Sequence, residues 1–205
     1  MSWLDAVHDG WVHPHRLRVL SEHFAGILPS AASVLDVGCG DGRLASLIAG
    51  LRPDLSFHAI DVLLRPDVAI PASAFDGNKI PFEGLSFDVV MFSDVLHHAA
   101  DPAMLLREAS RVARWSVAIK DHLLTGPLAR RTLAFMDRVG NLRHGIALPF
   151  NYWTHAQWTA AFMEAKLDVE VWQQKLRLYP FPANLLFERS LHFMARLKVS
   201  HTKQL

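Results

Sequence analysis

The feature that most constrains the fold is a short apolar run that ends in three alternate glycines, the segment VLDVGCGDG from Val34 to Gly42. The run is typical of a buried strand, and the helical pattern over 44–49 follows it, so the segment predicts a strand, a tight turn and a helix. Glycines in such a turn let the backbone bend sharply and approach a ligand without side-chain atoms in the way. The segment therefore predicts a ligand site at the end of the first strand of an α/β sheet.

The rest of the chain alternates between segments with the apolar pattern of strands and segments in which apolar residues recur every three or four positions, as in helices. We predict strands over 33–37, 57–60, 72–75, 87–92, 117–120, 167–173 and 186–194, and helices over 14–28, 44–49, 101–113, 127–139 and 154–165. Strands separated by helices pair in parallel, whereas the last two strands have no helix between them and should run antiparallel. The pattern predicts a doubly wound, mostly parallel, seven-stranded Rossmann-like α/β sheet with one antiparallel strand near the edge and helices on both faces.

Length and charge limit the organisation and the partners. The 205 residues suit a single domain, 1–205, with a helical lid over 1–30 and a substrate-side insert over 123–153. The 21 Lys and Arg nearly balance the 20 Asp and Glu, so the composition shows no excess of positive charge that would indicate binding of nucleic acid. No stretch approaches the ~20 apolar residues of a transmembrane helix, the first twenty residues are too charged for a signal peptide, and Cys39 has no disulfide partner. We expect a cytoplasmic protein; the composition leaves its oligomeric state open.

The glycine spacing separates the candidate ligands. A dinucleotide-binding G-x-G-x-x-G turn requires glycine or alanine at Arg43, but the third glycine comes one position earlier, at Gly42. A pyrophosphate would also meet the carboxylates of Asp36 and Asp41, and no Gly-Lys-Ser/Thr follows for a P-loop. A nicotinamide-dependent oxidoreductase is therefore the weaker alternative. The segment resembles the first motif of the class I S-adenosylmethionine-dependent methyltransferases.

This resemblance implies S-adenosylmethionine as the cofactor and assigns residues to it. Asp61 ends the second strand, where the family has an acidic residue that binds the ribose hydroxyls. Asp76 matches the acidic residue that accepts the adenine amino group, Phe75 would line the adenine slot, and Ser93 would lie near the methionine moiety. The implied cofactor-binding residues are Asp36, Gly38, Cys39, Gly40, Gly42, Asp61, Val62, Phe75, Asp76 and Ser93.

Two adjacent histidines are the candidate catalytic residues. The segment FSDVLHH over 92–98 resembles the fourth motif in methyltransferases of ubiquinone and menaquinone biosynthesis, which puts His97 and His98 between cofactor and acceptor. A neutral imidazole is suited to removing a proton from an acceptor, although a purely structural role stays open. Adjacent helical residues point about 100° apart, and no cysteine or carboxylate set completes a zinc pattern, so we predict no metal site. Asp94 either caps the following helix or contacts the ligand.

The acceptor is constrained only by the variable segments of the chain. Trp3 and Trp11 near the start, the insert, and the aromatic turn over 179–182 suit a flat, aromatic or lipid-like small molecule. The Arg130–Arg131 pair either contacts an anionic head group or faces solvent. We expect methylation of a small molecule on carbon, oxygen or nitrogen, with quinone, polyketide, lipid and sugar precursors all open. A non-catalytic cofactor-binding scaffold of the same fold is the other alternative.

Overall fold

The computed structural model describes residues 8–141 and 149–200, and within this part of the chain seven strands form one sheet. The strands are β1 (Ser33–Val37), β2 (Ser56–Asp61), β3 (Ala72–Ala74), β4 (Phe87–Ser93), β5 (Ala113–His122), β6 (Leu167–Gln173) and β7 (His192–Val199). Their order across the sheet is β3-β2-β1-β4-β5-β7-β6. The pairs from β3 to β5 are parallel, whereas β7 runs antiparallel to β5 and to β6. The predicted sheet, with one reversed strand near the edge, is confirmed.

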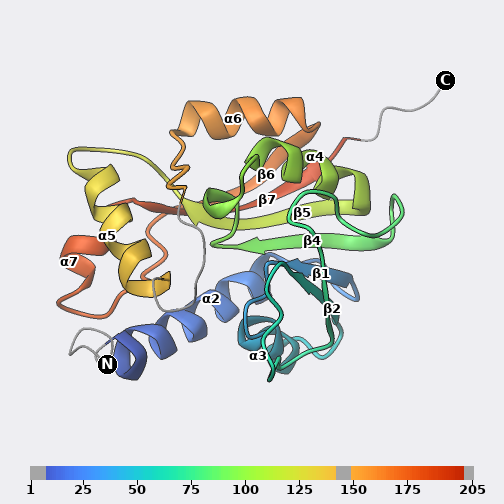
Figure 1. The fold of residues 1–205 in the computed structure, drawn as a ribbon, viewed down its shortest axis with the longest axis horizontal. Coiled ribbons are helices and arrows are strands. Elements are labelled where there is room, and N and C mark those ends of the chain that lie inside the picture. The colour runs from blue at the N-terminus through green and yellow to red at the C-terminus, as the bar shows by residue number, and fades with distance from the viewer. Residues whose placement is uncertain (1–7, 142–148, 201–205) are drawn as a thin grey trace.

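Helices cover both faces of this sheet. They are η1 (His8–Val12), α2 (His13–Ile27), α3 (Arg43–Leu51), η2 (Leu96–His98), α4 (Pro102–Val112), α5 (Ala129–Asn141), α6 (His155–Glu164) and α7 (Asn184–Phe187). In Figure 1, α4 and α6 lie above the sheet and α2 and α3 below it, while α5 and α7 stand together at the left-hand end. No described helix has both the length and the apolar character needed to cross a membrane.

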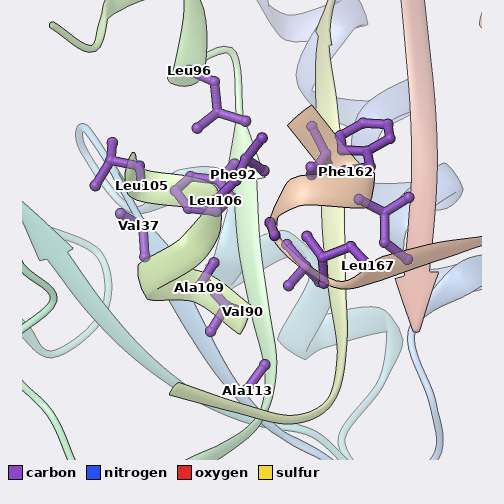
Figure 2. Close-up of a cluster of buried hydrophobic side chains, with 14 of the residues drawn as sticks. Val37, Val90, Phe92, Leu96, Leu105, Leu106, Ala109, Ala113, Phe162 and Leu167 are labelled. Carbon is purple, nitrogen blue, oxygen red and sulfur yellow. The ribbon is translucent and has the colours of Figure 1, made fainter. Parts of the chain in front are cut away.

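The two larger apolar clusters of the core are separated by the sheet, and a smaller third one includes Leu133 of α5. Leu106 of α4 and Phe162 of α6 pack with Phe92 on one face (Figure 2). Phe24 of α2 and Ile48 of α3 pack on the other. Successive side chains of β4 alternate between the two clusters, because strand side chains point to opposite faces in turn. This two-sided burial explains why the sequence of β4 is continuously apolar.

Two helices begin at the polar residues that the sequence indicated. The carboxylate of Asp101 accepts the N–H of Met104 at 2.9 Å at the start of α4. Thr154 and Gln157 form a capping box at the start of α6, in which each side chain bonds the other residue's backbone. Such caps satisfy amide groups that have no partner inside the helix. They fix where the crossover helices leave the carboxyl edge of the sheet.

The predicted strand over 186–194 is wrong at its beginning. Asn184 to Phe187 form the short helix α7, and β7 starts only at His192. The N–H of Leu185 bonds the carbonyl of Pro182, so the turn after the prolines continues as a helical turn instead of an extended strand. The apolar Leu185 and Leu186 are exposed, which the sequence could not distinguish from strand burial. Trp3 of the predicted lid and residues 142–148 of the predicted insert lie outside the described residues.

Candidate active site

The glycine turn after β1 lies at the carboxyl edge of the sheet and leaves space beside it. Gly38, Gly40 and Gly42 all have left-handed backbone angles, with φ of 78°, 59° and 71°. A Cβ atom on Gly38 would lie 2.5 Å from Cγ2 of Val95, so only glycine fits against the loop that follows β4. A Cβ atom on Gly40 would meet nothing nearer than the Arg65 guanidinium, at 3.8 Å. The turn therefore offers an open, side-chain-free backbone at Gly40 on which a ligand can lie.

Two acidic side chains adjoin this turn. One carboxylate oxygen of Asp61 accepts the N–H of Gly40 at 2.7 Å, and the other accepts the N–H of Leu63 at 2.9 Å. Burial, and then the neighbouring Asp61, raises the pKa of Asp36 to about 7. A ligand that brings positive charge would stabilise the ionised form of Asp36, and hydroxyl donors could bond the carboxylate of Asp61. S-adenosylmethionine has both properties, so the residues present fit this cofactor.

The end of β3 lies next to the end of β2. The N–H of Phe75 bonds the carbonyl of Asp61 at 3.2 Å, and Val62 lies close to Gly77. Asp76 is exposed, and N–H groups of Asn78 and Lys79 bond its carboxylate and lower its pKa, so it remains an acceptor at neutral pH. The carboxyl ends of β1, β2 and β3, which carry most of the residues assigned to the cofactor, therefore lie next to one another at one edge of the sheet.

A pocket of about 710 Å³ opens beside Phe75 and Asp76. Its other walls include Phe82 and Arg111. The pocket touches Phe75 and Asp76, the two residues predicted to bind adenine, but none of the other predicted cofactor residues. The candidate cofactor site is therefore defined by the adjoining strand ends and only its adenine end meets this pocket.

Cys39 is half-buried inside the glycine turn. Burial, and then the carboxylate of Asp36, raises the pKa of its thiol to about 12. The thiol therefore stays protonated at neutral pH and is a poor nucleophile. This environment fits the predicted role of Cys39 as a small residue that fills the turn.

Asp94 follows Ser93 at the end of β4 and is the centre of a partly buried ion cluster. Its carboxylate pairs with the ammonium group of Lys120 and, at 2.9 Å, with the guanidinium of Arg16 from α2. Lys120 is completely buried, and Arg16 stacks over the Tyr179 ring at 5.3 Å. The helical turn η2 has no side-chain cap, so Asp94 joins α2 to the sheet by charge instead of capping a helix.

His97 lies in a second charged network, next to the first. Its Nδ1 is 2.7 Å from a carboxylate oxygen of Asp121, and its Nε2 is 3.5 Å from Asp137. Burial alone would lower the pKa of His97, but the two carboxylates raise it to about 10. Asp137, on α5, also bonds Nε2 of His122 at 3.1 Å and accepts the hydroxyl of Tyr152. His97 is therefore an imidazolium at neutral pH and a poor proton acceptor.

His98 has the opposite character although it is the next residue. Its ring centroid is 3.9 Å from that of His97. Burial, and then the positive charge of His97, lowers the pKa of His98 to about 4. The pair therefore holds one charged and one neutral imidazole at pH 7, and of the two rings only the neutral one of His98 can accept a proton as a base.

The sequence reasoning missed the partners of this pair. Asp121, His122, Asp137, Tyr152 and His192 are all buried around His97. Asp121 and His122 extend β5 two residues beyond its predicted end, so the rule that ligands lie beyond strand ends could have indicated them. Asp137 follows Leu133 by four positions on the inward face of α5, a helical spacing that also marked it for burial.

Two groups of these side chains have donor atoms close enough to hold a metal ion. They are Asp94, His97 and His122, and His97, His98 and Asp137, with all ligand atoms of a group within 4.8 Å of one another. In the first group, Lys120 and Arg16 already balance Asp94, and hydrogen bonds occupy both ring nitrogens of His122. The sequence expectation of no metal depended on the spacing of the histidines along the chain and did not foresee Asp137; it stays a prediction.

The ion pairs of His97 predict a pH-dependent stability. A folded-state pKa of about 10, above the ordinary 6.5, means that the folded chain binds this proton more tightly than the unfolded chain. The stabilisation is complete below pH 6.5 and is lost as the pH rises towards 10. In urea unfolding, the difference in free energy between wild type and His97→Gln should shrink between pH about 6 and pH about 9. A difference that does not change with pH would contradict the charged assignment.

Comparison with known proteins connects this geometry to a family. A family model described as a methyltransferase domain matches residues 12–170. A curated relative from Amycolatopsis mediterranei (strain S699), 27-O-demethylrifamycin SV methyltransferase, is 31% identical over 62% of this chain and 52% of its own length. Ubiquinone biosynthesis O-methyltransferase of Nitrosomonas europaea is 30% identical over 50% of this chain and 47% of its own. The chain spans about half the length of these relatives.

Solved structures share the fold at low identity. A SAM-dependent methyltransferase from Aquifex aeolicus superposes with a TM-score of 0.61 at 16% identity and covers 96% of this chain and 98% of its own. The cyclase SpnF superposes with a TM-score of 0.64 at 14% identity, over 89% of this chain and 80% of its own. One architecture therefore supports more than one reaction.

Proposed function

The chain belongs to the S-adenosylmethionine-dependent methyltransferase family, and we propose that it methylates a hydroxyl oxygen of a small-molecule acceptor. Two curated relatives support this acceptor class, because their names describe methylation on oxygen in a rifamycin and in ubiquinone biosynthesis. An acceptor hydroxyl must lose a proton during the transfer. The neutral imidazole of His98, at the carboxyl edge of the sheet, supports a hydroxyl acceptor for that reason.

The observation that carries the proposal is the bond between the Asp61 carboxylate and the N–H of Gly40. The same carboxylate holds the glycine turn in place and keeps lone pairs for the ribose hydroxyls of the cofactor. When bound, S-adenosylmethionine supplies a methyl group on a positively charged sulfur. Asp36, Gly38 and Gly40 would bind the methionine part of the cofactor. Phe75 and Asp76 would bind its adenine.

For the acceptor, we assign the two histidines different roles. His98 is the catalytic base that removes the hydroxyl proton. His97 is a positioning residue, because Asp121 and Asp137 keep it charged and fix its ring against that of His98. In-line placement of donor and acceptor supplies most of the rate in such transfers, and the base adds to it.

Asp61→Ala tests the cofactor site. We expect the variant to bind S-adenosylmethionine about 1–3 kcal/mol more weakly in calorimetry, the usual cost of an unpaired buried polar group. Asp168→Ala, an exposed carboxylate on β6, is the matched control and should bind as the wild type does. Unchanged affinity in folded Asp61→Ala would remove the basis of the proposal.

Turnover must be measured separately, since the SpnF comparison shows that this fold does not fix the reaction. Transfer of an isotopically labelled methyl group to phenolic and aliphatic hydroxyl acceptors distinguishes an enzyme from a cofactor-binding scaffold. Label on the oxygen of an acceptor supports the proposal. Tight cofactor binding without transfer to any acceptor class would favour the scaffold.

A further inference from the structure

The helices α5 and α7 stand together at one end of the molecule (Figure 1), and several large apolar side chains on or next to them are exposed. These side chains, which we call the α5–α7 surface, are Leu128, Phe135, Phe181, Leu185 and Leu186, with exposed fractions from 46% to 71%. The two helices are in direct contact, because the ring of Phe135 stacks on that of Phe187 with centroids 6.1 Å apart. Large apolar side chains grouped on one surface, in contrast to single exposed ones, indicate an interaction site.

The segments that carry these apolar side chains are rich in positive charge. Residues 123–141 and 174–191 hold six of the chain's 21 Lys and Arg but only two of its 20 Asp and Glu. Asp137 is buried in the active site, and Glu188 accepts the N–H groups of Arg177 and Tyr179. This end of the molecule is therefore cationic although the whole chain is nearly neutral.

The helical spacing of α5 interleaves the two kinds of side chain. Arg131 and Arg138 lie four residues before and three residues after Phe135, so they flank it on the outer face of the helix. Arg189 binds the Thr132 hydroxyl at 2.7 Å, which places a further cation where α7 meets α5. Apolar side chains set among arginines are typical of segments that lie in the head-group region of a membrane.

We propose that the α5–α7 surface docks this protein on a bilayer that contains anionic phospholipids. The apolar side chains would enter the interface between head groups and acyl chains, and the arginines would bind the anionic head groups. The charge favours this occupant over a second copy of the chain, since two cationic surfaces would repel each other. The proposal does not depend on the methylation reaction, because it concerns only the outer surface.

The position of α5 gives this docking a consequence for the site. The inner face of the same helix carries Asp137, which contacts His97 and Tyr152. One helix therefore separates the proposed membrane surface from the candidate catalytic histidines. A lipid-like acceptor held in that bilayer would therefore lie close to the candidate catalytic histidines.

Vesicle flotation of the full chain tests the proposal. The wild type should float with vesicles of phosphatidylcholine mixed with phosphatidylglycerol, should not float with phosphatidylcholine alone, and should detach as salt increases. Leu185→Ser/Leu186→Ser should reduce the bound fraction about tenfold by removing buried apolar area. Arg131→Glu/Arg138→Glu should reduce it by a similar factor through charge.

Two surface changes elsewhere are the matched controls. Met163→Ser removes a 74%-exposed side chain on α6, and Lys198→Glu reverses an exposed charge on β7; both should float as the wild type does. Circular dichroism and a thermal melt check that all variants are folded. The proposal is wrong if the wild type ignores anionic vesicles or if the paired variants float unchanged. It is also wrong if light scattering shows a dimer that Leu185→Ser/Leu186→Ser dissociates.

Discussion

Replacing His98 with alanine should lower the turnover number at least about a hundredfold, the lower end of what a positioned general base contributes. The expectation follows from the protonation states of the pair. His98 is neutral at pH 7 because burial and the charge of His97 lower its pKa to about 4. Calorimetry should show S-adenosylmethionine affinity unchanged, since the glycine turn and Asp61 do not involve this ring.

The control for this experiment is His155→Ala, which removes an exposed histidine at the start of α6 and should leave turnover unchanged. The wild-type rate should be flat through neutral pH and fall on the acid side towards pH 4, where His98 becomes protonated. If His98→Ala keeps full turnover, placement of the acceptor alone accounts for the reaction. A rate that instead follows a group titrating near pH 7 would assign the base to another residue.

The positions of the residues proposed for the cofactor could be predicted from the sequence because each of them lies at or directly after the end of a strand. The glycine turn directly follows β1, and Asp61 and Asp76 directly follow the strands that deliver them. In a parallel sheet, neighbouring strands bring such ends to the same edge whatever the rest of the chain does. Family membership and architecture followed from this local information.

The surroundings of the two candidate catalytic histidines could not be predicted from the sequence in the same way. His97, Asp121, Asp137 and Tyr152 come from four separate segments, and only the packing of α5 against the end of β5 brings them together. The protonation states depend on that packing too, since two neighbouring histidines with the same ordinary pKa become one acid and one base. From the sequence alone, His97 and His98 were candidates for the same catalytic role.

The predicted start of the last strand was wrong for a different physical reason. Sequence patterns count apolar residues but do not report which surface they face, so exposed leucines look like strand residues. Leu186, where the predicted strand begins, is exposed on α7 and does not pair with β6. This misassigned leucine belongs to the α5–α7 surface that we propose docks on a membrane.

Asp94→Ala should lower the free energy of unfolding by about 3–5 kcal/mol, the cost of leaving a buried charge without its partner. Lys120 is completely buried and would lose the carboxylate that offsets its desolvation. Lys120→Met should cost much less, because Asp94 would still pair with Arg16 at 2.9 Å. Urea unfolding of the two variants measures this asymmetry.

The double variant Asp94→Leu/Lys120→Met separates charge from packing. If the loss in Asp94→Ala comes from the unpaired ammonium group, replacing both partners with apolar side chains should recover much of the stability. Because Asp94 also anchors Arg16 of α2, the double variant should bind α2 less firmly, and hydrogen exchange in α2 should speed up even where overall stability recovers. Equal losses in Asp94→Ala and Lys120→Met would mean that the two charges are solvated in solution, and the partly buried ion cluster would no longer explain how α2 is held beside the carboxyl edge of the sheet.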